Sequence, residues 1–420
     1  MRVQCYLIVI LIEAATVFHN TLAAQSTDTL LVPYRQGEKW GYADIRKTIV
    51  IPCQFDEALF FKNGYAVVKR KTFIENLWEV GVIKPDQQFS IGFEVGLLED
   101  RQDFKRLDFL KGVEAYYFSD SAGKALLSFV FEDGHIAPIP QAPPFAQIIS
   151  IEESLGLVFD CMGNMQCGFV DLSGKMVIPI EKLYASPFSE GLSGFGIWDK
   201  PSEMVRYGFQ NKRGEVVIAP IYESIGRFVE GMAAVRLGQK WSFVDKTGKI
   251  ILANVSDHSA VTLKFSEGLY FQEGRAAVLR NGKWGFIDKK GDLVVPCLYD
   301  DVGAFSEGLA AARLGTKWGF VGRNGEVVID FQFADDFGRN YMFMNGLAAV
   351  RQTQEGLLGF IDAKGVLVID YAYTEVEDIH FSINSFQSKR GFNPYGFALV
   401  CDPNQQWYYI DKQGVKYAED

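Results

Sequence analysis

Residues 271–296 read FQEGRAAVLRNGKWGFIDKKGDLVVP, and the phrases within this stretch recur along most of the chain. Lys-Trp-Gly appears at Trp284 and again at Trp40 and Trp318. In the best copies the tryptophan follows the glycine of Phe-x-Glu-Gly by ten residues: Gly231 to Trp241, Gly274 to Trp284 and Gly308 to Trp318. Such a fixed register indicates a tandem array of one structural unit.

The stretch predicts three short strands per unit. Residues 276–280 and 284–288 flank Asn281-Gly282, a strong hairpin signal because both residues tolerate positive φ. Asp288-Lys289-Lys290-Gly291 is typical of a type I turn, with aspartate at the first position and glycine at the fourth. A third strand then runs over 292–296 and ends at a proline, which suits a strand end or edge.

Aligning the chain on the glycine of Trp-Gly predicts ten units. Their anchors are Gly41, Gly81, Tyr117, Gly168, Gly208, Ser242, Gly285, Gly319, Gly359 and Tyr408. One unit cannot bury its aromatic face alone, so neighbouring units must stack. The predicted fold is therefore all-β: about ten three-stranded hairpin repeats in an open, β-solenoid-like stack. A β-propeller is the alternative, less favoured because a blade usually has four strands and a regular length.

The residues that recur have structural explanations. The tryptophans predict a shared core, and the glycine after each one predicts a close approach of a neighbouring backbone. These structural repeat residues are Trp40, Gly41, Trp241, Trp284, Gly285, Trp318, Gly319 and Trp407. The aspartate of Asp-x-x-Gly is interpreted as a turn former. The glutamate of Phe-x-Glu-Gly (Glu190, Glu230, Glu267, Glu273, Glu307) is interpreted as a hydrogen-bond acceptor.

No catalytic, cofactor-binding or metal-binding residue is predicted. One aspartate per unit is too few for calcium, which takes six to eight oxygens. The four histidines are scattered, so they assemble neither a metal cluster nor a Ser-His-Asp arrangement. The net charge of −10 argues against a nucleic-acid partner, because phosphates require a basic face.

The combination of Trp-Gly-Phe-(Ile/Val)-Asp-x-x-Gly with Phe-x-Glu-Gly-x-Ala-Ala resembles the WG-repeat family, also called KWG repeats. The resemblance extends from about Val32 to Tyr417 and is clearest around Trp241, Trp284 and Trp318. It implies a repeat fold with a binding role in a chiefly bacterial, often exported protein. It brings no catalytic residues to this chain.

The first 24 residues are typical of a secretory signal peptide, with an apolar run over 5–12 and a small-residue exit at Ala23-Ala24. We therefore expect an exported protein in the periplasm, at the cell surface or secreted, which contacts membrane only through this segment. The rest divides into N-terminal WG-like repeats (32–98), a degenerate seam with a proline linker (99–148) and a main array (149–420). Cys161 and Cys167 flank a short turn and form a candidate disulfide.

An unknown protein is the expected partner, because extended repeat surfaces commonly bind proteins. The loops that differ between units are the expected contact surface: 198–206, 255–266 and 384–394. An envelope glycan is the alternative partner. That alternative relies on aromatic residues outside the repeat position, such as Trp78 and Trp198, because residues held at one repeat position are usually core.

Overall fold

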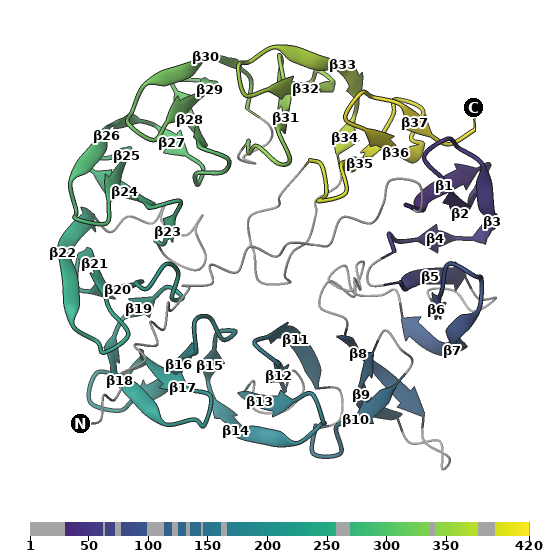
Figure 1. Cartoon of the computed structure of the whole chain (residues 1–420). Helices are drawn as coiled ribbons and strands as arrows, with labels where there is room; N and C mark the ends of the chain where they lie inside the picture. Colours follow the sequence, from purple (N-terminus) through teal and green to yellow (C-terminus); the bar gives the residue numbers. More distant parts are fainter. Residues whose placement is uncertain are drawn as a thin grey trace, which may run out of the picture.

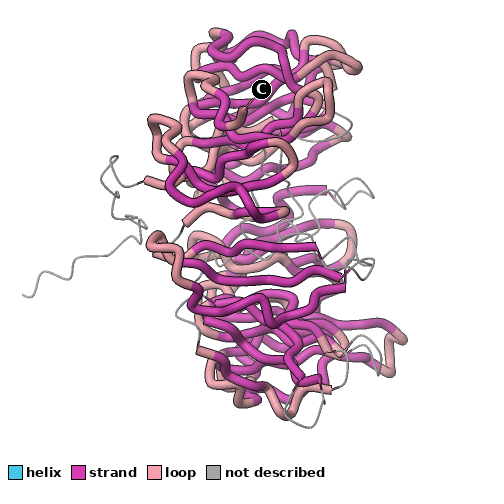
Figure 2. The backbone as a smooth tube through the Cα atoms, turned by 90° about the vertical axis from the view of Figure 1, so that its right-hand side faces the viewer, coloured by secondary structure: helices cyan, strands magenta, loops and turns pink. Residues whose placement is uncertain are grey.

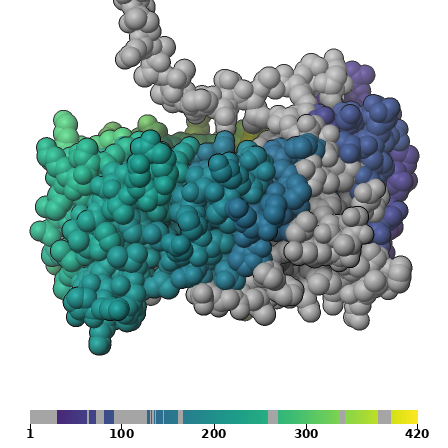
Figure 3. Space-filling view, turned by 90° about the horizontal axis from the view of Figure 1, so that it is seen from below, coloured from purple at the N-terminus to yellow at the C-terminus, as the bar shows by residue number. Residues whose placement is uncertain are grey.

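The computed structural model describes residues 30–61, 64–71, 77–98, 113–119, 125–131, 135–143, 146–160, 166–257, 269–335, 341–376 and 391–419. These residues form ten small sheets of antiparallel strands. The sheets follow one another around a ring, and the last sheet lies beside the first (Figure 1). Figure 2 shows the ring from its edge, as strands joined by short loops. Along the outer wall the blue and teal sheets abut directly (Figure 3).

The strands are grouped by sheet as follows. The first five sheets hold β1 (Val32–Gln36), β2 (Lys39–Ala43) and β3 (Ile49–Phe55); β4 (Glu57–Ala58), β5 (Ala66–Lys71), β6 (Leu77–Ile83) and β7 (Phe89–Leu98); β8 (Val113–Ser119), β9 (Ala125–Phe131) and β10 (Ile136–Pro138); β11 (Gln147–Glu152), β12 (Leu155–Phe159), β13 (Cys167–Asp171) and β14 (Met176–Lys182); β15 (Tyr184–Ala185), β16 (Leu192–Asp199), β17 (Met204–Asn211) and β18 (Val216–Tyr222). The other five hold β19 (Ser224–Ile225), β20 (Ala233–Leu237), β21 (Lys240–Val244) and β22 (Ile250–Asp257); β23 (Phe271–Gln272), β24 (Arg275–Arg280), β25 (Lys283–Asp288) and β26 (Leu293–Tyr299); β27 (Asp301–Val302), β28 (Leu309–Leu314), β29 (Lys317–Gly322) and β30 (Val327–Phe333); β31 (Leu347–Arg351), β32 (Leu358–Asp362) and β33 (Leu367–Tyr373); β34 (Glu375–Val376), β35 (Phe397–Cys401), β36 (Trp407–Asp411) and β37 (Lys416–Tyr417).

Most sheets have four strands, whereas the sequence predicts three. The additional strand is the innermost one, and in most sheets it has only two residues, as in β27. It follows directly after the outer strand of the preceding unit, so the chain passes from the outside of one sheet to the inside of the next. Two residues are too few to leave an alternating hydrophobic pattern, which explains why this strand was not predicted.

The seventh sheet shows why glycine follows tryptophan. Strands β25 and β26 pair at Trp284–Tyr299 and at Phe286–Val295, with a register shift between the two pairs. The bulged backbone of β26 therefore lies directly against Gly285. A Cβ atom at Gly285 would stand 2.4 Å from the Val295 carbonyl oxygen. Real Cβ atoms essentially never approach another atom this closely, so a larger residue does not fit without a shift of the backbone. The predicted close approach of a neighbouring backbone is confirmed here.

The turn after Trp-Gly-Phe is closed by its aspartate. Gly291 N donates to Asp288 O at 3.0 Å, as in a type I turn. The Asp288 carboxylate also accepts hydrogen bonds from Lys290 N (2.9 Å) and Asp292 N (3.0 Å). The interpretation of this repeated aspartate as a turn former therefore holds in this unit.

The third sheet corrects one predicted anchor. Tyr117 lies on β8 and pairs with Leu127, so it does not occupy the Trp-Gly position. That position belongs to Ser128 on β9, because the next residue, Phe129, pairs with Ala137 just before Pro138. The same arrangement joins Phe286 to the residue before Pro296 in the seventh sheet. Because serine and leucine replace glycine and tryptophan here, the motif gave no guide to the register.

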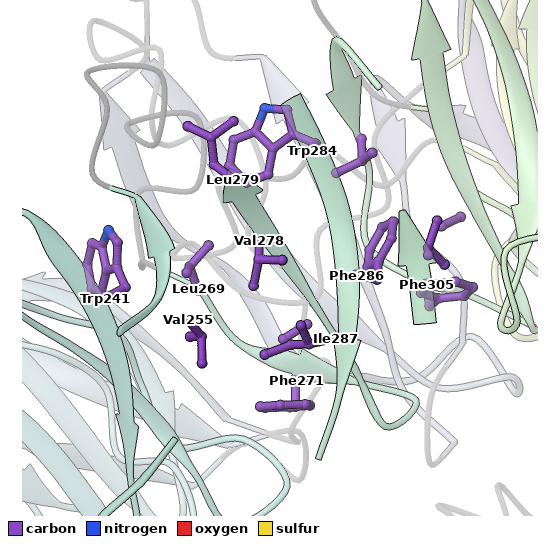
Figure 4. Close-up of a cluster of buried hydrophobic side chains, with 14 of the residues drawn as sticks. Trp241, Val255, Leu269, Phe271, Val278, Leu279, Trp284, Phe286, Ile287 and Phe305 are labelled. Atoms are coloured by element: carbon purple, nitrogen blue, oxygen red, sulfur yellow. The ribbon is translucent and has the colours of Figure 1, made fainter. Parts of the chain in front are cut away.

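In the described residues, aromatic pairs of one kind join neighbouring sheets at seven junctions. The phenylalanine of Trp-Gly-Phe packs against the aromatic residue of the next unit's Phe-x-Glu-Gly, as Phe286 does against Phe305 (Figure 4). Ring centroids in these pairs are 4.7 to 5.1 Å apart, and the pairs are Tyr42–Phe61, Phe169–Phe188, Phe209–Phe228, Phe243–Phe271, Phe286–Phe305, Phe320–Phe343 and Phe360–Phe392. The core therefore continues from sheet to sheet around the ring.

The repeated glutamate also joins neighbouring units. The Glu230 carboxylate accepts hydrogen bonds from Gly274 N of the next unit at 3.1 and 3.3 Å, and the Lys289 ammonium of that unit lies 3.0 Å away. The same bond joins Glu153 to Gly191, Glu190 to Gly231, Glu273 to Gly308 and Glu307 to Gly346. The predicted acceptor role is confirmed for Glu190, Glu230, Glu273 and Glu307, and Glu267 lies outside the described residues.

The ring is closed by a backbone contact that also joins consecutive units. After an outer strand ends, the next residue donates its N–H to the second strand of the following sheet, as Asp300 N does to Arg313 O at 2.9 Å. At the ends of the chain, Glu419 N donates to Arg35 O at 3.0 Å, and Ala418 is bridged to Arg35. The last sheet therefore meets the first through the same backbone hydrogen bond, although the bridge at Ala418 is parallel.

An aromatic residue also crosses this closing junction. The ring of Phe60, which follows β4, lies 4.9 Å from that of Tyr409 on β36 and 5.4 Å from that of Phe397 on β35. The all-β repeat class is confirmed, and the closed ring corresponds to the β-propeller alternative rather than to the favoured open stack. Repeat spacing predicts which units touch, but it leaves open the small rotation per unit that decides closure.

Lysine–aspartate pairs explain the first residue of Lys-Trp-Gly. The Lys283 ammonium lies 2.5 Å from the Asp300 carboxylate, which also accepts a hydrogen bond from Gly315 N of the next unit at 2.8 Å. Lys240 and Asp257 form the same pair at 2.9 Å. The lysines hold the pKa of Asp300 and of Asp257 below the ordinary aspartate value.

These pairs predict that the ring loses stability in acid. Because the two aspartate pKa values are lower in the folded state, their contribution is complete above the unfolded pKa of about 4 and is lost as pH falls through the folded pKa. Urea unfolding midpoints of the wild type should therefore decrease between neutral pH and pH 3. The D257N/D300N double variant should show a shallower decrease, and an equal decrease in both proteins would contradict this role.

The predicted signal peptide, residues 1–24, lies outside the described residues. Within the ranges that are described, there is no helix long and apolar enough to cross a membrane. The predicted seam, 99–148, contributes β8, β9 and β10, and these stand in the ring between the second and fourth sheets. The division of the chain at residues 98 and 148 stays a prediction.

Candidate functional site

The hairpin of β16 and β17 is longer than the equivalent hairpin in the next sheet. Its strands pair over eight consecutive positions without a register shift, from Leu192–Asn211 to Asp199–Met204. Strands β20 and β21 pair over five positions. The three additional pairs extend the hairpin beyond the sheet while keeping the alternation of side chains. We call this extension, residues 197–206, the Trp198 ribbon.

The Trp198 ribbon exposes large apolar side chains on both of its faces. Trp198 is 54% exposed and stands on the same face as its cross-strand partner Val205. On the opposite face, Ile197 is 37% exposed and Met204 is 47% exposed. Exposed apolar side chains clustered on one projecting element are typical of an interaction site.

A tyrosine pair extends the Trp198 face toward the sheet. Tyr184 on β15 and Tyr207 on β17 both lie opposite Gly196, and their rings meet edge to face with centroids 5.3 Å apart. A Cβ atom at Gly196 would stand 3.1 Å from the Tyr207 ring and 3.0 Å from the Tyr184 Cβ, so glycine allows the rings to close over the backbone. Tyr184 is 37% exposed. The result is an aromatic strip of Tyr184, Tyr207 and Trp198.

Polar contacts stabilise the two ends of the ribbon. In the turn, the Asp199 carboxylate accepts hydrogen bonds from the Ser202 hydroxyl (2.5 Å) and the Ser202 N–H (3.3 Å). At the base, the Arg206 guanidinium lies 3.6 Å from the Glu223 carboxylate, which also binds Arg236 of the next sheet at 2.7 Å. The ribbon therefore projects from a base that is fixed to its neighbour.

The sequence predicted only part of this site. It named the loop 198–206 and singled out Trp198, but it missed Tyr184, Ile197 and Gly196. The available signal was spacing, because Gly191 precedes Tyr207 by sixteen residues whereas Gly231 precedes Trp241 by ten. Six extra residues add three pairs to a hairpin. Their even number preserves the inside–outside alternation.

The repeat tryptophans lie elsewhere in the ring. Trp284, Trp318, Trp241 and Trp40 are buried, and Trp407 is partly buried. A Cβ at Gly41 or Gly319 would meet the carbonyl oxygen of Ile51 at 2.4 Å or of Ile329 at 2.6 Å, as at Gly285. The side chain of Trp78 lies outside the described part of the structure.

The other two predicted contact loops are described only at their ends. Val255 and Ser256 are buried on β22, and Phe392 is buried beside a cavity of about 310 Å³ that Met342 and Met344 also line. The Glu307 carboxylate at this cavity is occupied by hydrogen bonds from Asn345 N and Gly346 N. The lining of this cavity mixes apolar side chains with Ser306, Glu307 and Asn345.

The described residues contain no group of three or more His, Cys, Asp or Glu side chains that could hold a metal ion. Cys167 is buried, and burial raises the pKa of its thiol. Cys161 lies outside the described residues, so a disulfide between these two cysteines stays a prediction.

Comparison with solved structures returns ring-forming and other proteins of low similarity. A crystal structure of the eukaryotic initiation factor is 12% identical, with 92% of this chain and 94% of that chain covered and a TM-score of 0.43. The β-propeller domain of the Trilobed protease from Pyrococcus furiosus is 8% identical, with coverage of 76% and 99% and a TM-score of 0.32. TolB from Acinetobacter baumannii is 11% identical, with coverage of 72% and 78% and a TM-score of 0.25.

No curated protein matches the chain in sequence. The family model described as WG containing repeat matches six times, at residues 40–71, 168–196, 207–241, 259–284, 284–318 and 318–354. Five of these segments contain the strand of the Trp-Gly position together with the bulged outer strand that follows it. The chain is therefore a member of the WG-repeat family.

Proposed function

We propose that this protein is an exported scaffold that binds a protein partner, in the cell envelope or outside the cell, through the Trp198 ribbon. The strongest support is the exposure of Trp198 on a projecting hairpin. In the neighbouring hairpin the tryptophan, Trp241, is buried in the core. Exposed tryptophans are frequent among the few residues that dominate binding energy at protein interfaces. The closed ring would hold this element in a fixed orientation.

A scaffold accounts for the recurring polar residues better than an enzyme does. The repeated glutamates bind the next unit, and the repeated lysines bind aspartates. A catalytic centre needs reactive groups that converge in a pocket. The carboxylates that recur here are already engaged in holding units together, which supports a binding role without catalysis.

Replacing Trp198 with alanine tests this proposal. We expect retention of the partner from an envelope extract to weaken by about 30-fold, the effect of losing a binding contribution of about 2 kcal/mol. Stability should change by less than about 0.5 kcal/mol, because the side chain is exposed. Proteins retained by the immobilised mature chain would be quantified by mass spectrometry.

Leu237→Ala supplies the matched control. Leu237 is 59% exposed at the tip of the equivalent hairpin in the next sheet. Its truncation removes exposed apolar surface from a hairpin other than the ribbon. Retention of one partner by the wild type and by Leu237→Ala, but not by Trp198→Ala, is the expected result. Equal retention by all three proteins would show that the ribbon is not the binding element.

An envelope glycan is the second candidate partner, because the exposed Trp198 ring and the Tyr184–Tyr207 pair offer flat apolar surfaces for a sugar ring. Affinity electrophoresis in gels that contain envelope polysaccharide distinguishes the two candidates. Retardation of the wild type, abolished in Trp198→Ala, would favour the glycan. Unchanged mobility together with capture of a protein would favour the protein partner.

A further inference from the structure

The Trp198 ribbon has open backbone edges on both sides. Strand β15 pairs with β16 only at Gly196 and Phe195, whereas β16 continues to Asp199. On the other side, pairing between β17 and β18 begins at Tyr207, whereas β17 itself begins at Met204. Among the residues that the structure describes, the ribbon residues therefore form ladder bonds only with each other.

The backbone of Trp198 faces the edge next to β15. Ser186 N donates to Gly194 O at 2.9 Å, so the backbone groups of Gly194 point toward the inner strand. Because these directions repeat every second residue, the groups of Gly196 and Trp198 point to the same side. Within the described residues, no strand is paired there beyond Tyr184. Trp198 therefore presents one N–H donor and one C=O acceptor at the open edge.

Three outer strand edges of the ring are protected by two devices. The outer strands β3, β18 and β26 each contain a register shift and a proline: Pro52, Pro220 and Pro296. Bulges and prolines at an edge prevent another strand from pairing. The Trp198 ribbon has neither device before Pro201 in its turn.

The first sheet, which has no inner strand, is protected in the same way. In the sixth sheet, Gly226 N donates to Ala234 O across the innermost edge, so the backbone groups of Ala234 face inward. Pro33 occupies the equivalent position on β1, and proline has no N–H to offer to an added strand. The edge of β1 therefore differs from the open edge at Trp198.

We propose that the partner binds by strand addition: an extended polypeptide segment pairs with the Trp198 edge of β16. This inference rests on the proposed function and specifies its chemistry. Main-chain bonds to Trp198 would supply affinity, and the aromatic strip of Tyr184, Tyr207 and Trp198 would select apolar side chains at alternate positions of the segment. A glycan cannot supply the regular amide donors and acceptors that such an edge pairs with.

Peptides displayed on phage provide the probe. A random library of peptides of about twelve residues is selected on the mature wild-type chain after depletion on Trp198→Ala. Selected peptides are then synthesised, and their affinities are measured by calorimetry for the wild type, Trp198→Ala and Leu237→Ala. We expect binding to the wild type and to Leu237→Ala, and at least about tenfold weaker binding to Trp198→Ala.

N-methylation of single peptide amides then separates main-chain from side-chain recognition. Methylation removes a backbone donor and keeps the side chain, so strand addition predicts a loss of about tenfold at one position, the peptide amide that donates to the Trp198 carbonyl oxygen. Comparable losses at several positions, or no loss at any position, would overturn strand addition and would favour a side-chain interface at the ribbon. Failure to select any peptide that depends on Trp198 would also overturn it. The proposed function fails separately, if the partner is retained equally by Trp198→Ala.

Discussion

Trp284→Ala is expected to destabilise the ring by about 3 to 5 kcal/mol, the range for truncating a large buried aromatic residue. Trp284 is 1% exposed and belongs to a core cluster that includes residues of the sixth, seventh and eighth sheets. Figure 4 shows it beside Leu279 on the neighbouring strand. The alanine would leave a cavity that its surroundings cannot fill without moving the backbone of β25.

Hydrogen exchange followed by mass spectrometry shows which sheets lose amide protection in the variant. Because each sheet packs on its neighbours, protection should fall first in the sixth to eighth sheets and last on the far side of the ring. Trp198→Ala is the control, because it makes the same substitution at an exposed tryptophan. It should change the free energy of unfolding by less than about 0.5 kcal/mol. Unchanged protection in the sheets that flank Trp284 would contradict a shared core.

Gly285→Ala is expected to cost about 3 kcal/mol, at the upper end of the usual range for overpacking. The new Cβ would stand 2.4 Å from the Val295 oxygen and 2.8 Å from Cys297 N. Both atoms belong to backbone, so relief requires β26 to move away from β25. Urea unfolding of the variant and the wild type measures the cost.

The sixth sheet supplies a control at the same repeat position. Ser242 already carries a Cβ there, and the outer strand has adapted, with Asn254 at φ 52° and its N–H donating to the Ser242 hydroxyl at 3.0 Å. Ser242→Ala should therefore cost only about 1 kcal/mol, for one lost hydrogen bond. If Ser242→Ala and Gly285→Ala cost the same, contact with the outer strand is not what selects glycine.

Much of the fold was predictable because each unit is locally determined. Asn281-Gly282 and Asp288–Gly291 specify their turns through residues that tolerate the required backbone angles, and both strand pairs follow from them. The burial of Trp284 could be inferred because an aromatic residue that recurs at the same position of the repeat is buried when neighbouring units stack. These inferences depend on contacts within one unit or between adjacent units.

The rest depended on geometry that local sequence does not express. A two-residue inner strand such as β27 has no detectable periodicity, and closure depends on the summed rotation of ten units. Phe60, which crosses the closing junction to Tyr409, matches no position of the repeat motif. The Trp198 ribbon was predicted as a variable loop, because an insertion between two strands reads as a loop unless its length is compared with that of other units.

The closure of the ring can be tested by one distance. Spin labels would be introduced as encoded, non-cysteine residues at Glu38, in the β1–β2 turn, and at Gln405, in the turn before β36, both of which are exposed. Adjacent sheets pack about 10 Å apart, so ten sheets in an open stack would place the ends about 90 Å apart. Double electron–electron resonance should instead give one narrow distribution below about 30 Å, because the first and last sheets are neighbours. A distribution centred beyond about 60 Å would contradict the closed ring.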